Sequence, residues 1–261
     1  MKPRCVIWGV GNFARQVSVQ LSPRFDIAGY VVDDHCHQER QFMGRPCLPF
    51  SLLETHENLG AEHFFCAIGY GNFNQNRAGC VQKMLAKGLQ PISVISGQAI
   101  VDDSAQIGAN CYVGPGAIID ADVRIGSAVT ILPGAIIGHD SSLADNAYIC
   151  QGVNIPGFVH IGANSFVGTG AIFSDGVSIG DFCFIKAGEK VFHHCEDGKL
   201  TSGLDARVFF DSWYDNRKTL YSAMLSRQFA EARKQLTVKI FFNKENAMKI
   251  LISGINTAGF I

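Results

Sequence analysis

The sequence predicts two structural units: a small α/β domain with a parallel sheet, and then a solenoid of stacked short strands. Three observations support this prediction. A Gly-rich turn follows an apolar stretch near the N-terminus, strand and helix patterns alternate up to about residue 94, and a six-residue repeat begins at residue 95. The chain has 261 residues, of which 47% are hydrophobic and 17% charged, as in packed globular proteins.

Charge and cysteine content argue against several classes of partner. The formal net charge of -1 gives no electrostatic reason to expect nucleic acid or an anionic membrane. No apolar run reaches the roughly 18 residues of a membrane span, and the N-terminus lacks the pattern of a signal peptide. Nine cysteines without C-x-x-C spacing fit a reducing compartment. We therefore expect a cytoplasmic protein.

Two clusters contain metal-ligating residue types, His35-Cys36-His37 and His193-His194-Cys195. Neither cluster has the ligand spacing of known zinc motifs. We expect two polar loops and no metal site.

The first unit opens with "CVIWGVGNFARQVSVQL", which predicts a strand, a Gly-rich turn and a helix. Gly9-x-Gly11-x-x-Ala14 matches the dinucleotide fingerprint, with Ala in the third place. The glycines allow a tight turn, and a helix N-terminus attracts phosphate. The next predicted strand, "DIAGYVVDD", ends in Asp33 and Asp34, where an acid often contacts a ribose hydroxyl.

A third strand, in "EHFFCAIGYGN", ends near Gly69, and a helix over 74–88 and a short strand "PISVI" follow. Strands that alternate with helices predict a small, Rossmann-like parallel sheet over residues 1–94. About 94 residues provide little more than one mononucleotide-binding half. We therefore expect a mononucleotide, or the nucleotide end of a nucleotide-sugar, rather than NAD. An empty crevice is the alternative. The expected lining residues are Gly9, Gly11, Asn12, Asp33, Asp34 and Gly69.

The second unit, over residues 95–195, is a repeat of six residues, as in "AIIDAD VRIGSA VTILPG AIIGHD". In each hexad the aliphatic residue points inward and stacks on its equivalents, a small residue lets the chain bend, and Gly, Asn or Asp tolerates the turn. One column is apolar at all seventeen positions: Ile95, Val101, Ile107, Val113, Ile119, Ile125, Ile131, Ile137, Leu143, Ile149, Ile155, Ile161, Val167, Phe173, Ile179, Ile185 and Val191.

This tract resembles the hexapeptide-repeat acyltransferases. The resemblance implies a left-handed parallel β-helix with about 18 residues per coil, a homotrimer, and acyl-CoA bound between adjacent prisms. Solenoids of this kind can also be purely structural, so the repeat predicts the fold and not the function.

The combination of both units is more specific. It resembles the sugar acyltransferases that include bacterial UDP- and GDP-4-amino-sugar N-acetyltransferases and sialic acid O-acetyltransferases. The resemblance covers about residues 4–191 and depends on "WGVGNFA", "YVVDD", "AIGYGN", the in-frame hexads and "GHD". It implies that the first domain holds a nucleotide-sugar, that the prism holds acetyl-CoA, and that a prism histidine faces their junction.

His139 and Asp140 are the candidate catalytic pair. His139 is the second residue after the inward Ile137, so it is expected at a turn and pointing outward. A neighbouring carboxylate can fix its tautomer and raise its basicity. The resemblance assigns Gly157 a backbone N–H that binds the acetyl carbonyl, and assigns Arg207, in "GLDAR", a contact to a CoA phosphate. The alternative is an exposed turn histidine without a catalytic role.

Two positions depart from the family pattern. Leu132 stands where members often carry Asn, and Tyr148 stands where many carry His, which puts helper contacts to sugar or cofactor in doubt. Residues 196–261 form a tail with an amphipathic helix expected over about 216–236. The final "MKILISGINTAGFI" is expected to be an edge strand or a frayed end.

The resulting hypothesis is an acyltransferase that moves an acetyl group from acetyl-CoA to the amine of a nucleotide-linked amino-sugar, in surface glycan or polysaccharide synthesis. Two alternatives stay open. One is O-acetylation of a sialic acid or other sugar hydroxyl. The other is a non-catalytic scaffold that binds a sugar-nucleotide.

Overall fold

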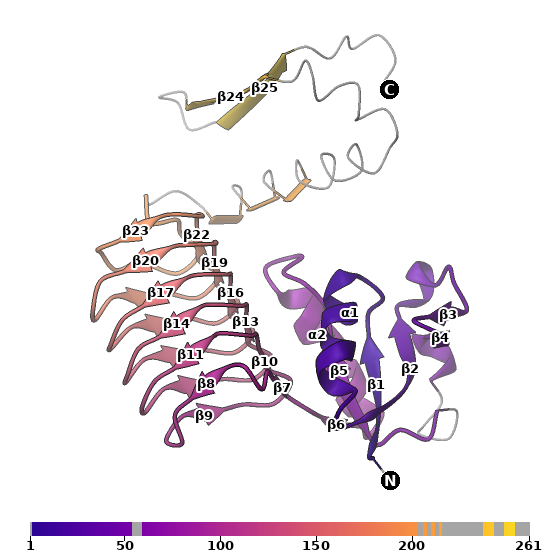
Figure 1. Cartoon of the computed structure of the whole chain (residues 1–261). Coiled ribbons are helices and arrows are strands. Elements are labelled where there is room, and N and C mark those ends of the chain that lie inside the picture. The colour runs from indigo at the N-terminus through magenta and orange to yellow at the C-terminus, as the bar shows by residue number, and fades with distance from the viewer. Residues whose placement is uncertain are drawn as a thin grey trace. The chain divides into compact units, whose positions relative to one another are not determined.

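The computed structural model describes residues 2–53, 59–202, 206–207, 210–211, 214–215, 237–242 and 248–253 (Figure 1). The chain forms two compact units, Met1–Phe210 and Asp211–Ile261. In the second unit, β24 (Thr237–Phe242) and β25 (Met248–Ser253) form an antiparallel hairpin. The tail helix expected over about 216–236 lies outside the described residues. Within the described part of the chain, no helix is long and apolar enough to cross a membrane.

The N-terminal sheet has the strand order β3-β4-β2-β1-β5-β6. Its parallel core consists of β1 (Arg4–Trp8), β2 (Asp26–Val32) and β5 (His63–Cys66), with β6 (Gln90–Pro91) at one edge. Two helices accompany these strands, α1 (Asn12–Leu21) and α2 (Gln75–Ala86). The Rossmann-like parallel arrangement is therefore confirmed for these strands, and α2 agrees with the helix predicted over 74–88.

The segment between β2 and β5 differs from the predicted alternation of strands and helices. It forms η1 (Asp34–Cys36), β3 (Gln41–Phe42), β4 (Arg45–Pro49) and η2 (Phe50–Leu52). β3 pairs antiparallel with β4, which pairs parallel with β2. The prediction of a crossover helix is therefore wrong for the described part of this segment. Pro46 and Pro49 lack the N–H that a helix interior needs, and Gly44 adopts a positive φ.

The repeat forms a parallel β-helix with three faces, which are named here by their outward side chains. The covered face contains β7 (Val94–Ile95), β10 (Tyr112–Val113), β13 (Thr130–Ile131), β16 (Tyr148–Ile149), β19 (Phe166–Val167) and β22 (Phe184–Ile185). The apolar face contains β8 (Ile100–Val101), β11 (Ile118–Ile119), β14 (Ile136–Ile137), β17 (Asn154–Ile155), β20 (Ile172–Phe173) and β23 (Lys190–Val191). The polar face contains β9 (Gln106–Ile107), β12 (Arg124–Ile125), β15 (Ser142–Leu143), β18 (His160–Ile161) and β21 (Ser178–Ile179).

The register of these strands confirms the predicted repeat. Each strand pairs with the strand three hexads later, as Ile119 pairs with Ile137 and Ile137 with Ile155. The predicted apolar column points inward and is buried from Val113 to Val191. At the start of the column Ile95 is 38% exposed, because the first coil has a neighbouring coil on one side only. Stacked aliphatic side chains thus form the core of the β-helix.

The covered face packs against the N-terminal domain. Its outward side chains would be exposed in an isolated coil, yet Tyr112, Tyr148 and Phe166 are each at most 5% exposed. The Phe13 ring contacts Tyr112 edge-on at 5.0 Å, and Tyr70 contacts both Tyr148 and Phe166 in the same manner. These aromatic contacts attach α1 and the loop after β5 to the coils.

Candidate active site

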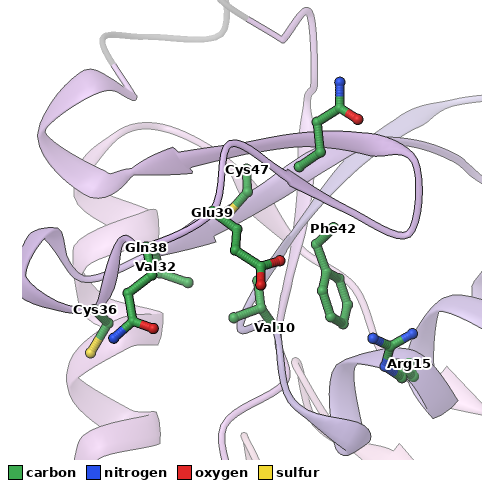
Figure 2. A pocket seen from close by; sticks show the side chains of 9 residues that line it. Val10, Arg15, Val32, Cys36, Gln38, Glu39, Phe42 and Cys47 are labelled. Carbon is green, nitrogen blue, oxygen red and sulfur yellow. The ribbon is translucent and has the colours of Figure 1, made fainter.

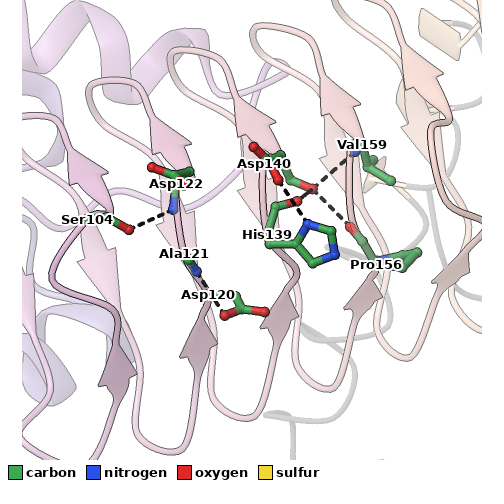
Figure 3. Close-up of polar contacts among 9 residues, drawn as sticks. Ser104, Asp120, Ala121, Asp122, His139, Asp140, Pro156 and Val159 are labelled. Atoms are coloured by element: carbon green, nitrogen blue, oxygen red, sulfur yellow. Dashed lines mark hydrogen bonds and ion pairs between the residues drawn. The ribbon is translucent and has the colours of Figure 1, made fainter.

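His139 lies at the turn that follows β14, on the edge of the apolar face. Its Nδ1 is 3.0 Å from Oδ2 of Asp140, and about half of each side chain is exposed (Figure 3). Asp140 adopts a left-handed backbone conformation with φ 55°, which Asp tolerates better than most residues. The turn therefore presents both side chains outward, as the hexad position predicted.

The Asp140 carboxylate controls the chemistry of the imidazole. Its hydrogen bond to Nδ1 raises the pKa of His139, and the charges of Asp140, Asp120 and Asp175 add to this shift. Because the ionised carboxylate can only accept a hydrogen bond, Nδ1 carries the hydrogen and the neutral imidazole has its lone pair on Nε2. The pair is thus arranged as a base whose free nitrogen faces away from its carboxylate partner.

Gly157 lies directly against the His139 ring, one coil further along. A β-carbon at this position would be 2.6 Å from Cε1 and 2.8 Å from Nε2 of the imidazole. The ring also meets Phe158 edge-on at 5.1 Å, and the Phe158 N–H donates to the His139 carbonyl at 3.0 Å. Among the described residues, no group accepts a hydrogen bond from the Gly157 N–H. Glycine at 157 therefore makes room for the ring and leaves an amide donor beside it.

The turns around this site are braced from neighbouring coils. The Ser141 hydroxyl donates to the Pro156 carbonyl at 2.9 Å and accepts from the Val159 N–H at 3.1 Å. Two coils earlier, the Ser104 hydroxyl accepts from the Asp122 N–H at 2.8 Å (Figure 3). These bonds hold consecutive turns in fixed register, which a catalytic arrangement requires.

In the N-terminal domain, the predicted nucleotide residues gather at the carboxyl ends of β1, β2 and β5. Gly9 has φ 119°, and a β-carbon there would lie 2.8 Å from the Ala67 carbonyl oxygen, so only glycine fits. Gly11 caps the N-terminus of α1 and Asn12 is its first residue, and both are exposed. Gly69 follows β5, the strand next to β1. The exposed helix N-terminus can accept a phosphate.

The two acids after β2 are engaged with protein groups. Asp33 forms an ion pair with Lys83 at 2.8 Å. Asp34 accepts a hydrogen bond from the Ser51 N–H at 2.9 Å, and this bond lowers the pKa of the Asp34 carboxyl. Their contact with a ribose stays a prediction.

A pocket next to the glycine turn was missed by the sequence analysis. It has a volume of about 220 Å³ and is lined by residues that include Val10, Arg15, Gln38, Glu39 and Phe42 (Figure 2). The polar run after β2 is the signal in the sequence that could have indicated it. Its lining is set by the fold of residues 34–49, which the sequence did not predict.

Arg77 is another feature that the sequence did not predict. It lies on α2, is 1% exposed, and joins that helix to the coils. Its Nε donates to the Ala128 carbonyl at 2.9 Å and its Nη2 donates to the Asn146 carbonyl at 2.8 Å. The guanidinium also stacks over the Tyr148 ring at 5.5 Å. Burial lowers the pKa of Arg77 to about 10, so the group stays charged at neutral pH.

The structure also describes Leu132, Tyr148 and Arg207. Leu132 and Tyr148 are 8% and 5% exposed, so both side chains pack inside the protein. Arg207 donates from Nη1 to the Asn72 side chain at 2.8 Å and lies 5.3 Å from the centre of the Phe73 ring. The predicted contact of Arg207 with a CoA phosphate stays a prediction.

The two His/Cys clusters make local hydrogen bonds. His37 Nε2 is 3.1 Å from the Cys47 carbonyl oxygen, and His194 Nδ1 accepts from the Ser178 N–H at 2.9 Å. Over the described residues, no three side chains of His, Cys, Asp or Glu gather in a way that could hold a metal ion.

Comparison with known proteins supports the fold. The family model for the GMPPB C-terminal domain matches residues 93–196, which contain the coils. Among curated proteins, no sequence matches the chain. A solved structure of perosamine N-acetyltransferase from Caulobacter crescentus, a histidine variant in complex with CoA and GDP-perosamine, is 28% identical. The match covers 75% of this chain and 91% of that chain, with a TM-score of 0.69.

Two further structures support the fold. The acetyltransferase domain of PglB from Neisseria gonorrhoeae FA1090 is 22% identical over 76% of this chain and 96% of that chain, with a TM-score of 0.67. WeeI from Acinetobacter baumannii AYE is 19% identical over the same shares, 76% and 96%, with a TM-score of 0.67. The resemblance to the hexapeptide-repeat sugar acyltransferases is confirmed.

Proposed function

We propose that this chain, as a structural relative of hexapeptide-repeat sugar acetyltransferases, moves an acetyl group from acetyl-CoA to the amine of a nucleotide-linked amino-sugar. The observation that carries the proposal is the corner formed by His139, Asp140 and Gly157, which combines an oriented base with an amide N–H that has no acceptor among the described residues. The similarity to an enzyme solved with CoA and GDP-perosamine supports the choice of substrates.

The reaction needs three contributions from the protein. The amine attacks the thioester carbonyl while His139 Nε2 accepts its proton, and the Asp140 carboxylate stabilises the resulting imidazolium. The Gly157 N–H donates to the oxygen that becomes negative in the tetrahedral intermediate. Collapse of the intermediate releases CoA, and the proton on His139 is available to the leaving thiolate. Alignment of the two substrates by the rigid coils supplies much of the remaining acceleration.

The N-terminal domain holds the nucleotide in this proposal. The diphosphate lies at the N-terminus of α1, where Gly9, Gly11 and Asn12 form the turn, and Asp33, Asp34 and Gly69 border the same edge. We further propose that the coils turn left-handed, as the resemblance implies, that the domains meet near residue 94, where the repeat begins, and that the reaction occurs in the cytoplasm, where acetyl-CoA is available. The acetylated product would serve surface glycan or polysaccharide synthesis.

The proposed active form is a homotrimer. The apolar face supports this, because its outward residues Ile100, Ile136 and Ile172 are 65%, 39% and 48% exposed. The neighbouring corner adds Phe158 and Phe192, which are 61% and 62% exposed. Packing this face against another prism would bury these apolar side chains, with Asn154 between Ile136 and Ile172, and bring His139 to the interface.

Thiol release from acetyl-CoA tests the proposal directly. Purified protein is offered a panel of nucleotide-linked amino-sugars and free sugars, beside the His139→Ala and His160→Ala variants. His160 is a suitable control because it is also an exposed coil histidine whose Nδ1 contacts one neighbour, the Ser142 hydroxyl at 2.8 Å. Turnover with an amino-sugar nucleotide, lost by about 10²-fold or more only in His139→Ala, is the expected result.

Other outcomes separate the alternatives. Acetylation of a sugar hydroxyl in place of an amine would identify an O-acetyltransferase. Failure to bind acetyl-CoA, together with retained nucleotide-sugar binding, would contradict the proposal in favour of a non-catalytic scaffold.

A further inference from the structure

The pocket beside the glycine turn has the position and size for one flat ring system. It begins at Val10, between the two glycines of the turn, and extends past the end of β2 to Phe42 on β3 (Figure 2). Its volume of about 220 Å³ is smaller than the pockets that enclose whole drug-sized ligands. A diphosphate at the N-terminus of α1 would therefore place its nucleoside next to this pocket.

The loop that carries Gln38 and Glu39 is held in place by bonds from β4 and η2. Asp34 accepts from the Ser51 N–H at 2.9 Å, and His37 contacts the Cys47 carbonyl at 3.1 Å. The Cys47 N–H donates to the Arg40 carbonyl at 2.8 Å. The polar run that resembled a metal cluster thus fixes the wall of the pocket, and Glu39 is presented from a braced loop.

The pocket is lined by one acidic side chain, Glu39, and one basic side chain, Arg15. Figure 2 shows the Glu39 side chain extending toward Val10, with its carboxylate between Gln38 and Phe42 in this view. The Arg15 guanidinium lies 4.6 Å from the centre of the Phe42 ring. No ion pair within the described residues joins Arg15 to Glu39, and both side chains are exposed. Both charges are therefore available to a ligand.

Guanine is the base whose edges complement this pair of charges. Its N1–H and N2–H₂ are two adjacent donors, which a carboxylate can accept together, and its O6 and N7 are two acceptors that suit an Arg guanidinium. Uracil presents N3–H between two carbonyl oxygens, which would bring negative atoms against Glu39. Adenine and cytosine each pair one amino group with a ring-nitrogen acceptor, so a carboxylate gains only one hydrogen bond from them.

We infer that this pocket binds the nucleotide base and selects guanine, with Glu39 accepting from N1–H and N2–H and Arg15 donating to O6 and N7. This inference rests on the proposed use of a nucleotide-sugar and names its nucleotide. Val10 and Phe42 supply apolar walls for the ring. The substrate is then a GDP-linked amino-sugar.

Direct binding of nucleoside diphosphates tests this inference without acetyl transfer. Calorimetric titration of the full chain with GDP, UDP, ADP and CDP should show GDP binding at least about tenfold more tightly than the others. Glu39→Gln should weaken GDP binding about tenfold and bring the GDP and UDP affinities together, because the amide accepts at one atom only. Glu62→Gln, which changes an exposed acid that does not line this pocket, should leave all affinities unchanged.

Three results would overturn the inference. UDP could bind as tightly as GDP, Glu39→Gln could leave the ratio of affinities unchanged, or no diphosphate could bind. In each case the same preparation is titrated with acetyl-CoA and assayed for thiol release. Acetyl transfer to a UDP-linked amino-sugar would reject guanine selection alone and leave the proposed acetyltransferase intact, whereas absence of all nucleotide binding would reject the nucleotide-sugar substrate as well.

Discussion

At the scale of single residues, the candidate base depends on one hydrogen bond that lies largely in solvent. His139 and Asp140 are adjacent in sequence, and the left-handed turn at Asp140 brings their side chains together at 3.0 Å. Exposed charge pairs contribute little to stability, so this pair is better explained by what it does to the imidazole. The bond fixes the tautomer and raises the pKa of His139 above its ordinary value of 6.5.

The first prediction concerns the pH dependence of acetyl transfer. The base must be neutral, so kcat/KM should rise with pH through the raised pKa of His139, at a pH above 6.5. Asp140→Asn removes the carboxylate that raises this pKa, so the rising limb should move to lower pH while the plateau rate falls about tenfold or more. A kcat/KM profile between about pH 5 and 9 measures both effects. An unmoved limb in Asp140→Asn would contradict the assigned role.

The second prediction concerns Gly157. Its backbone conformation suits any residue, but a β-carbon there would meet the imidazole at 2.6 Å. Gly157→Ala should therefore displace the His139 ring and lower kcat about 10²-fold, with little change in Tm. Gly97→Ala is a matched control, because a β-carbon at Gly97 contacts nothing within 4 Å. Equal activity of the two variants would contradict the proposed role of Gly157 and would show that the observed position of the His139 ring is not needed for acetyl transfer.

At the scale of elements, the sequence predicted what repeats and missed what depends on distant contacts. The inward column from Val113 to Val191 and the outward position of His139 follow from a strict period of six, so both were predictable. The single short strand predicted in "PISVI" is instead parts of two strands. Pro91 pairs in the N-terminal sheet, whereas Val94 and Ile95 pair in the β-helix.

The missed features share a physical reason. β3 and β4 depend on the pairing of β4 with β2, and Arg77 depends on carbonyl groups 51 and 69 residues further along the chain. Local pattern carries no information about such partners. In the sequence Arg77 has the appearance of a surface charge, although it lies on the buried side of α2 with Cys80, Val81 and Met84.

The third prediction concerns Arg77 as the attachment of α2 to the coils. Arg77→Met roughly keeps the length of the side chain but leaves the buried Ala128 carbonyl and the partly buried Asn146 carbonyl without these donors. The variant should lose about 3 kcal/mol of unfolding free energy, measured from the midpoint in denaturant. Arg124→Met, an exposed arginine on the polar face, should change stability by less than about 0.5 kcal/mol. Comparable losses in the two variants would contradict the role of Arg77.

At the scale of the whole molecule, the three faces of the β-helix have different surroundings. The covered face is buried by the N-terminal domain and, at Phe166 and Phe184, also by Phe210. The polar face carries outward Gln106, Arg124 and Ser142, which suit water. The apolar face instead exposes isoleucines beside the corner that carries His139. Exposed apolar side chains of this kind often mark interfaces, so the proposed trimer would place the proposed base at a subunit contact.

The fourth prediction tests this coupling. Ile100→Glu and Ile172→Glu change side chains that are 65% and 48% exposed, so folding should survive while charges disrupt the proposed prism-to-prism packing. Light scattering should show the wild-type protein at three times its chain mass of 28.3 kDa, and the variants at the chain mass with acetyl transfer reduced at least about tenfold. Val19→Glu is the control, since Val19 is also 65% exposed but lies on α1. A fully active monomer would show that one prism holds the complete site, and that the apolar face serves another contact.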